Sequence, residues 1–402
     1  MSIVTLTTRG ALRKSDMREA NERLVLNIIR QNPELSRSGV ARKTGFSPSS
    51  ITLIVNRMMG RGWIAEERGG GGAGLGRRPG ALRLRPEAMV AIGVEVAAPN
   101  ARVVAADLDG KFLRSEAVAF DSHPKVFLAR VRAAIIAMSR KISRHHSVIG
   151  VGVSLPGTLD GSSGKVYAAE NWGWYDVDAG RILSDGISLP FFFGNDARLA
   201  ALAEKWFTAP GVEPMNHFVF VTLRDGLGTG VIIDGKLLQG PTGQAAEFGH
   251  TILFPGGRPC PCGNTGCWEE YASGRALQRM YAERSGSRVR PEEIVTRARA
   301  GDAAAYECLR SAATFAATGF VNVKQVFDPE TIVIGDYLAS GWDLVQDVVW
   351  EVLHKHLRNL YLGELRIVTA RHGDDSTIMG AVALVLSNFL TCFENVSLHS
   401  RL

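Results

Sequence analysis

Four residues able to bind a soft metal ion stand close together in this 402-residue chain. They are His250, Cys260, Cys262 and Cys267, in the segment HTILFPGGRPCPCGNTGCWEE. One imidazole and three thiolates form the ligand set of a closed tetrahedral zinc site, and thiolates favour zinc over magnesium or calcium. The Cys-x-Cys pair is tighter than that of common zinc fingers, so three reduced cysteines without a metal are the alternative. The polar, glycine-rich loop favours one structural Zn²⁺ that stiffens it.

A carboxylate, Glu269, stands two residues after the last of these cysteines. Carboxylates and amides that hydrogen-bond adjacent hydroxyl groups recognise sugars, and selective recognition requires that these groups are held in fixed positions. A loop stiffened by a metal ion would hold Glu269 in this way. We therefore expect this loop to act as a sugar clamp.

Alternating strands and helices are expected to position the loop. Strands are predicted in residues 89–98, 101–110 and 111–120, followed by an amphipathic helix at 124–142 and a strand at 147–157. The alternation resumes further along the chain. This pattern predicts an α/β protein with two similar layered halves and no solenoid-type repeat. A chain of this length is also too long for one ordinary core.

The charge of the chain is unevenly distributed. Residues 1–86 contain 16 Lys and Arg against 6 Asp and Glu, whereas the remainder contains 30 against 34. A basic head on a slightly acidic body indicates that the head binds a polyanion. A basic solvated surface without a partner is the alternative explanation.

The head has the pattern of a helix-turn-helix. An apolar stripe in NERLVLNIIRQN predicts a first helix, Ser36 and Gly45 bound a second, and Ser47 with Pro48 begins a third. Two short helices joined by a tight turn are typical of DNA-binding proteins, although a purely structural three-helix module has the same periodicity. The outward polar side of the third helix, where base contacts are expected, consists of Ser49, Ser50, Thr52, Asn56 and Arg57.

A β-hairpin wing is predicted after the third helix. The segment GWIAEERGGGGAGLGRRPGALRLRP has two short alternating stretches around a glycine-rich tip that carries Arg77 and Arg78. Arginines on a narrow, flexible backbone suit a minor groove or phosphate contacts. A flexible linker with incidental charge is the alternative. Because charge, helix order and wing agree, we expect double-stranded DNA as a partner.

The N-terminal sequence contains no secretory signal, and no stretch approaches the roughly 18 apolar residues of a membrane helix. A cytoplasmic location and no membrane partner are expected. In that compartment a cysteine cluster binds a metal or acts in catalysis more often than it forms disulfides.

Several ordered motifs identify a family. SLPGTLD, NDARLAAL, AAEFGH, CPCGNTGCWE and GRRPGALRL make residues 18–402 resemble the ROK family of repressors, open reading frames and kinases. The resemblance implies a winged helix-turn-helix at 1–85 and a two-lobed, actin-like (ribonuclease H-like) sugar-kinase fold at 86–402. One lobe would comprise about 86–196 plus the C-terminal helix, and the other about 197–380 with the zinc loop.

The same resemblance implies which residues bind ligands. The zinc ligands would be the four residues already named, and His250 would contact both zinc and sugar. The implied sugar contacts are Asn171, Asn195, Asp196, Glu247, His250 and Glu269. In the kinases of this family Asp196 would be the catalytic base.

The segments that would bind ATP phosphates depart from the pattern of the family's kinases. Side chains replace glycines where a phosphate requires close approach of the backbone. The departures in the phosphate loops are Glu95 with Ala97 and Ala98, and Arg224 with Asp225. On the adenosine side, Gly335 followed by Asp336 replaces a Gly-Gly pair.

We therefore expect a sugar-responsive repressor of carbohydrate genes that has lost ATP use, acts as a homodimer or homotetramer, and is released from its operator by a monosaccharide or amino sugar. A sugar kinase of the glucokinase or N-acetylhexosamine kinase type, carrying a DNA-binding head, is the main alternative, because Asp196 is retained. A zinc-stabilised scaffold is a third, but it leaves the clamp and the basic head unexplained.

Overall fold

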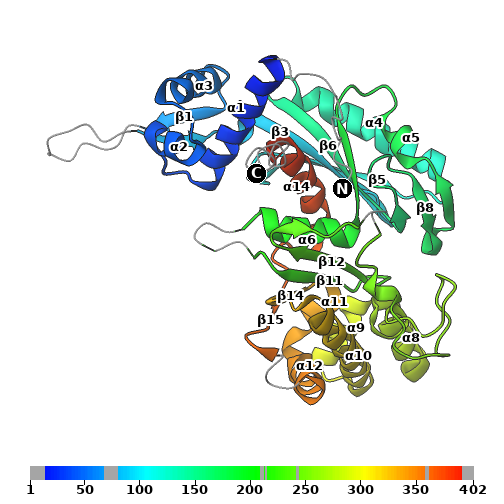
Figure 1. Ribbon diagram of the computed structural model, residues 1–402. Helices are drawn as coiled ribbons and strands as arrows, with labels where there is room; N and C mark the ends of the chain where they lie inside the picture. Colours follow the sequence, from blue (N-terminus) through cyan, green and yellow to red (C-terminus); the bar gives the residue numbers. More distant parts are fainter. Residues whose placement is uncertain are drawn as a thin grey trace.

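The computed structural model of the chain describes residues 14–67, 80–208, 212, 215–240, 244–357 and 362–391. Figure 1 shows a small head beside an upper lobe, and a second lobe below it. This is the predicted architecture of a winged helix-turn-helix followed by a two-lobed actin-like fold. None of the described helices combines the length and apolarity that a membrane crossing requires.

The head contains the predicted helices and wing strands. Ser36 accepts a hydrogen bond from the Gly39 amide, Gly45 closes the second helix in the left-handed region (φ 72°), and Ser47 caps the third. Two strands then pair antiparallel, as predicted for a wing. The elements are α1 (Lys14–Gln31), α2 (Arg37–Thr44), α3 (Pro48–Gly60), β1 (Ile64–Glu67) and β2 (Ala81–Leu84).

The first lobe is a five-stranded sheet in the order β10-β6-β3-β4-β5, covered on one face by α4 and α5. Its strands and helices are β3 (Met89–Glu95), β4 (Asn100–Ala106), β5 (Phe112–Ala119), α4 (Pro124–Ile142), β6 (Ser147–Leu155), α5 (Ala179–Ser184) and β10 (Phe191–Asn195). The predicted strands and the 124–142 helix are confirmed. A small sheet that the sequence did not predict contains β7 (Thr158–Leu159), β8 (Val166–Ala169) and β9 (Trp174–Val177), with the 3₁₀ turn η2 (Glu170–Trp172) between β8 and β9.

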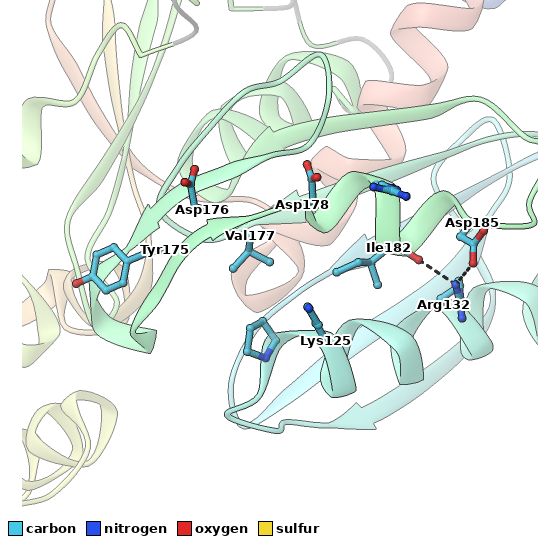
Figure 2. Close-up of a pocket in the computed structure, with 10 residues that line it drawn as sticks. Lys125, Arg132, Tyr175, Asp176, Val177, Asp178, Ile182 and Asp185 are labelled. Carbon is cyan, nitrogen blue, oxygen red and sulfur yellow. Dashed lines mark hydrogen bonds and ion pairs between the residues drawn. The ribbon is translucent and has the colours of Figure 1, made fainter.

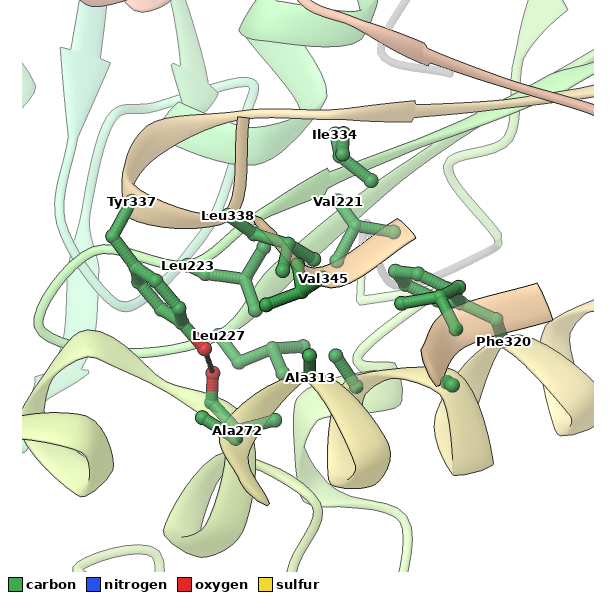
Figure 3. Close-up of a cluster of buried hydrophobic side chains, with 14 of the residues drawn as sticks. Val221, Leu223, Leu227, Ala272, Ala313, Phe320, Ile334, Tyr337, Leu338 and Val345 are labelled. Atoms are coloured by element: carbon green, nitrogen blue, oxygen red, sulfur yellow. Dashed lines mark hydrogen bonds between the residues drawn. The ribbon is translucent and has the colours of Figure 1, made fainter. Parts of the chain in front are cut away.

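The second lobe is a five-stranded sheet in the order β13-β12-β11-β14-β15. Its strands are β11 (Phe218–Thr222), β12 (Gly228–Ile233), β13 (Lys236–Leu237), β14 (Thr331–Ile334) and β15 (Arg366–Thr369). Its α-helices are α7 (Glu269–Ala272), α8 (Gly274–Ser285), α9 (Pro291–Arg299), α10 (Ala303–Phe327), α11 (Asp336–Ser340) and α12 (Trp342–His356). Figure 3 shows Leu223, Leu227 and Tyr337 in its core, so the β11–β12 loop is anchored at both ends.

Two helices connect the lobes and the head. The helix α6 (Asp196–Trp206) packs on β12 of the second lobe and on α14 (Ser376–Thr391), which in turn packs on β3 and β6 of the first. The two helices approach very closely, because a Cβ atom on Gly380 would lie 1.8 Å from the Leu199 carbonyl oxygen. The same α14 contacts α1 of the head.

The head and the first lobe share a continuous hydrophobic core. Leu26 and Ile29 of α1 belong to the same buried cluster as Val382 and Leu386 of α14. In addition, the Arg30 guanidinium of α1 lies 4.2 Å from the centre of the Trp206 ring at the end of α6. Burial lowers the pKa of Arg30 to about 10. The head is therefore packed directly against both connecting helices.

Candidate functional site

The four predicted metal ligands meet in the loop between β13 and α7. The His250 Nδ1 and Cys260 Sγ atoms are 3.7 Å apart, as are the Cys262 and Cys267 Sγ atoms. One donor atom from each residue lies within 4.8 Å of the others. Zn–S bonds of about 2.3 Å in a tetrahedral site place neighbouring sulfurs about 3.8 Å apart. The donor atoms therefore have the spacing of a closed four-ligand site.

The chemistry of these thiols also fits a cation. Burial raises the pKa of the Cys267 thiol to about 11 and raises that of the Cys260 thiol as well. Both are consequently protonated at neutral pH unless a positive charge stabilises their thiolates. The Cys262–Cys267 separation is too long for a disulfide bond of about 2.05 Å. A zinc ion would supply the positive charge, and with all four positions taken by protein its role would be structural.

The loop is tightly folded and anchored. A Cβ atom on Gly266 (φ 79°) would lie 1.8 Å from the Phe254 carbonyl oxygen, so only glycine fits this turn. The next anchor is the fully buried Trp268, whose indole Nε1 donates to the Phe315 carbonyl of α10 at 2.9 Å. The residue after it, Glu269, therefore starts from a fixed backbone position.

The Glu269 side chain has partners within the protein. It is 7% exposed, and its Oε2 accepts from the backbone amide of Leu227 at 2.9 Å. Its Oε1 accepts from Arg275 Nη2, also at 2.9 Å. Each oxygen of this carboxylate has a second lone pair that can accept from a ligand hydroxyl, while its two protein partners link the loop of the candidate metal ligands to the β11–β12 loop.

Arg275, at the start of α8, is a residue that the sequence analysis did not identify. Its guanidinium donates to Glu269 at 2.9 Å, to Glu270 at 2.7 Å and to the Asn171 side chain at 2.6 Å. Asn171 belongs to η2 of the first lobe, so this arginine connects the lobes. It also brings the predicted sugar contacts Asn171 and Glu269 to one guanidinium.

The remaining predicted sugar contacts lie around the start of α6. Asn195 caps this helix by accepting from the Ala197 amide at 3.1 Å, and its side-chain nitrogen donates to the Gly157 carbonyl at 3.1 Å. Glu247 accepts from Arg198 at 2.8 Å. Asn195 therefore has a structural role, as the cap of α6, whether or not it contacts a ligand.

Two carboxyl groups in this region have raised pKa values. Burial raises the pKa of Asp196, and the nearby Arg224 opposes the shift. Burial also raises the pKa of Glu247, with Arg198 and His250 opposing the shift and Asp196 adding to it. Asp196, Glu247 and His250 thus share one electrostatic environment, where neutral hydroxyl groups fit better than additional negative charge.

One residue from each of the three departures from the kinase pattern belongs to a single ion cluster. Arg224 donates through Nη1 to Glu95 Oε1 and through Nε to Asp336 Oδ1, both at 2.9 Å. Asp336 also accepts from the Thr222 hydroxyl at 2.6 Å and the Leu223 amide at 2.7 Å. Glu95 belongs to the first lobe, whereas Arg224 and Asp336 belong to the second. We call Glu95, Arg224 and Asp336 the interlobe ion cluster.

A separate pocket of 610 Å³ lies on the first lobe, between α4 and the β9–α5 segment (Figure 2). Lys125 and Arg132 line it together with Tyr175, Asp178 and Asp185, and Arg132 is paired with Asp185. None of the residues predicted to bind a sugar or a metal ion lines this pocket. It is therefore distinct from the site described above.

In the head, the partly exposed Arg57 pairs with a buried carboxylate. Its Nε lies 2.9 Å from the carboxylate of Glu22 on α1, which is 3% exposed and also pairs with Arg61 at 2.7 Å. Since α1 and α3 are joined by this pair, Arg57 holds the third helix in place. The predicted base contacts Ser49, Ser50, Thr52 and Asn56 are all exposed on α3.

The side of α3 that carries those four residues is connected to the wing. Arg37 of α2 forms two hydrogen bonds with Glu66 of β1, at 3.1 and 2.8 Å, and donates to the Asn56 Oδ1 at 2.9 Å. This arginine, which the sequence analysis did not identify, fixes the orientation of the wing relative to α3. The wing-tip residues Arg77 and Arg78 lie outside the described residues.

Comparison with known proteins gives two matches to protein families. The profile described as ROK family matches residues 91–388, and the profile described as winged helix-turn-helix DNA-binding matches residues 18–65. The xylose repressor of Caldicellulosiruptor bescii is 26% identical in an alignment of 391 positions that covers 93% of this chain and 97% of the repressor.

Two solved structures are also similar. A ROK family transcriptional regulator described as a homologue of the E. coli MLC protein has a TM-score of 0.79 at 23% identity, over 93% of this chain and 98% of that one. A ROK family glucokinase from Streptomyces griseus, in complex with glucose and AMPPNP, has a TM-score of 0.64 at 30% identity. The latter similarity covers 73% of this chain and 98% of the glucokinase.

Proposed function

This chain belongs to the ROK family, and we propose that it is a sugar-responsive transcriptional regulator, a repressor that a bound sugar releases from DNA. The observation that carries the proposal is a shared hydrophobic core. It joins a head that matches a DNA-binding domain to the part of the chain that contains the predicted sugar-binding residues. The similarity to a xylose repressor extends over 93% of the chain and supports the same function.

The sugar would bind between the lobes, close to the zinc loop. Glu247, His250 and Glu269 would accept or donate hydrogen bonds to its hydroxyl groups, and Asp196 and Asn171 would contact it from α6 and η2. Asn195 completes this set by holding the start of α6 and the Gly157 loop. A monosaccharide or amino sugar is the ligand class that these carboxylates and amides suit.

We infer that the protein does not phosphorylate its sugar. The interlobe ion cluster stands on the segments where the family's kinases would receive ATP, and Arg224 there has two carboxylate partners of its own. A nucleotide would have to displace these ion pairs and face Asp225, which adds negative charge to the same loop. Asp196 would then act as a hydrogen-bond acceptor without passing on a phosphoryl group.

The other parts of the proposal follow from this role. One zinc ion per chain would hold the clamp, and the chain would act in the cytoplasm as a homodimer or homotetramer, because two heads match two operator half-sites. We propose units of 1–85 for the DNA-binding head and 86–402 for the sugar-binding lobes. Arg77 and Arg78 would contact phosphates or the minor groove, whereas Arg57 would position α3.

The change Asp196→Asn tests the sugar response. It replaces a charged acceptor by a neutral amide, which should weaken sugar binding about tenfold or more. The sugar concentration that releases DNA should rise by the same factor, while sugar-free DNA binding is unchanged. The measurement is titration of monosaccharides and amino sugars into a complex with labelled promoter DNA. ATP turnover that depends on sugar and disappears in this variant would instead establish the kinase.

The same variant gives an independent result in the absence of ligand. Because burial raises the pKa of Asp196 above its unfolded value, the charged carboxylate lowers stability at every pH above that unfolded value. Asp196→Asn should therefore raise the melting temperature at pH 7. The gain should disappear as the pH falls through the unfolded pKa of about 4, where the wild-type carboxyl is neutral in both states. A melting temperature lowered at pH 7 would contradict this account.

A further inference from the structure

The hydrogen-bonding groups on the outward side of α3 are largely engaged within the head. The Ser49 and Ser50 hydroxyl oxygens lie 3.0 and 2.9 Å from the Ser47 hydroxyl oxygen. The Thr52 hydroxyl donates to the Pro48 carbonyl at 2.9 Å. A threonine bonded in this way turns its hydroxyl toward the helix backbone and leaves its methyl group to make the outward contact.

One apolar side chain in the middle of this surface lies outside the hydrophobic core. Leu53 is 60% exposed, whereas the inward residues Ile51 and Val55 are fully buried. Among the described residues, Leu53 packs into none of the hydrophobic clusters that form the core. Single exposed leucines are common on protein surfaces, so exposure alone carries little weight. The position of Leu53 on the helix and the residue one turn further along are stronger evidence.

That neighbour is Asn56, three residues after Leu53 and therefore adjacent on the helix surface. Its Oδ1 accepts from Arg37 at 2.9 Å, whereas its Nδ2 group donates to none of the described residues and the side chain is exposed. The surface thus presents an apolar group, formed by Leu53 and the Thr52 methyl, beside an amide donor. The surrounding head has the charge and helix order of a DNA-binding module.

A thymine in the major groove presents the complementary pair. Its C5-methyl group is apolar, and its neighbouring O4 accepts a hydrogen bond; no other base of DNA combines the two. We propose that Leu53 and Asn56 read a thymine in each half-site, with Leu53 on the methyl group and Asn56 Nδ2 on O4. The proposal rests on the DNA binding proposed above and names the base that this surface selects.

Deoxyuridine provides a direct test, because it differs from thymine only by lacking the methyl group. The wild-type protein first selects its preferred duplexes from a random 30-base-pair pool, and each thymine of the selected sequence is then replaced by deoxyuridine. We expect one thymine per half-site at which the replacement weakens binding by about fourfold, the value of one buried methyl group. In Leu53→Ala this difference should disappear, so that both duplexes bind equally.

Leu24→Ala is the matched control, since it truncates another exposed leucine of the head, located on α1 (36% exposed). It should preserve the preference for thymine over deoxyuridine, and Asn56→Ala should weaken binding while preserving part of that preference. Melting curves check that each variant is folded. The proposal is overturned if Leu53→Ala keeps the wild-type preference or if no thymine responds to replacement. If the wild-type protein selects no sequence, the DNA-binding function itself fails, which is a different result.

Discussion

Replacing Arg224 by alanine is expected to lower the free energy of unfolding by about 3 kcal/mol. Glu95 and Asp336 are 7% and 12% exposed at their side chains; in this variant Asp336 loses its arginine partner and Glu95 keeps only Arg102, at 4.0 Å. Removal of one member of a buried ion pair typically costs about 3–5 kcal/mol, and the partial exposure of Arg224 places the cost at the lower end. Chemical denaturation monitored by tryptophan fluorescence measures this loss.

Two further variants distinguish the stability contributed by the interlobe ion cluster from that of an ordinary surface ion pair. Arg224→Lys should recover less than half of the lost stability, because an ammonium group cannot reach two carboxylates with the planar geometry of a guanidinium. Arg310→Ala breaks a surface pair with Asp347 inside the second lobe and should cost about 1 kcal/mol or less. If Arg224→Ala costs no more than Arg310→Ala, the interlobe ion cluster does not hold the lobes together.

The second large effect concerns the zinc site. Cys267→Ser should reduce the zinc content from one ion per chain to near zero and weaken sugar binding at least tenfold, although Cys267 itself is not expected to contact sugar. The reason is that Glu269 follows the loop directly and needs its fixed backbone. DNA binding without sugar should persist, because the head makes none of these contacts. Elemental analysis and sugar titration provide the two measurements.

Cys308→Ser is the matched control for this change. Cys308 is a buried free cysteine in α10, outside the metal cluster. Its replacement should lower stability slightly and leave both zinc content and sugar binding intact. A Cys267→Ser protein that retains its zinc, or wild-type protein that contains none, would remove the basis for a metal-held clamp.

The local features of this chain were predictable from sequence. The four candidate metal ligands lie within one loop, the helix caps at Ser36 and Ser47 are local, and the α4 segment has a clear helical period, so short-range patterns suffice. The β7–β9 sheet, whose strands contain two to four residues each, was missed; the equally short wing strands were predicted because the charge and helix order of the head supported them.

The long-range partners were not predictable. Arg275 and Asn171 are 104 positions apart, and Arg224 and Glu95 are 129 apart. Nothing in a local pattern indicates such pairs, because only the fold brings them together. The sequence analysis therefore interpreted Glu95, Arg224 and Asp336 as three separate departures from a nucleotide site, whereas in the structure Arg224 is the ion partner of both carboxylates. The pairing of Arg57 with Glu22 was likewise not predictable, because Glu22 lies on another helix.

The core shared by the head and the first lobe limits how such regulators can be recombined. An exchange of residues 1–85 for the head of another regulator would preserve chain continuity but place a foreign α1 against α14. Leu26, Ile29 and Arg30 would then have to be matched to Val382, Leu386 and Trp206 by the new sequence. New operator specificity is consequently easier to obtain by exchanging the exposed residues of α3 alone. In this architecture the part that can be exchanged independently is one surface of a helix. The remainder of the head has to be exchanged together with the first lobe, against which it packs.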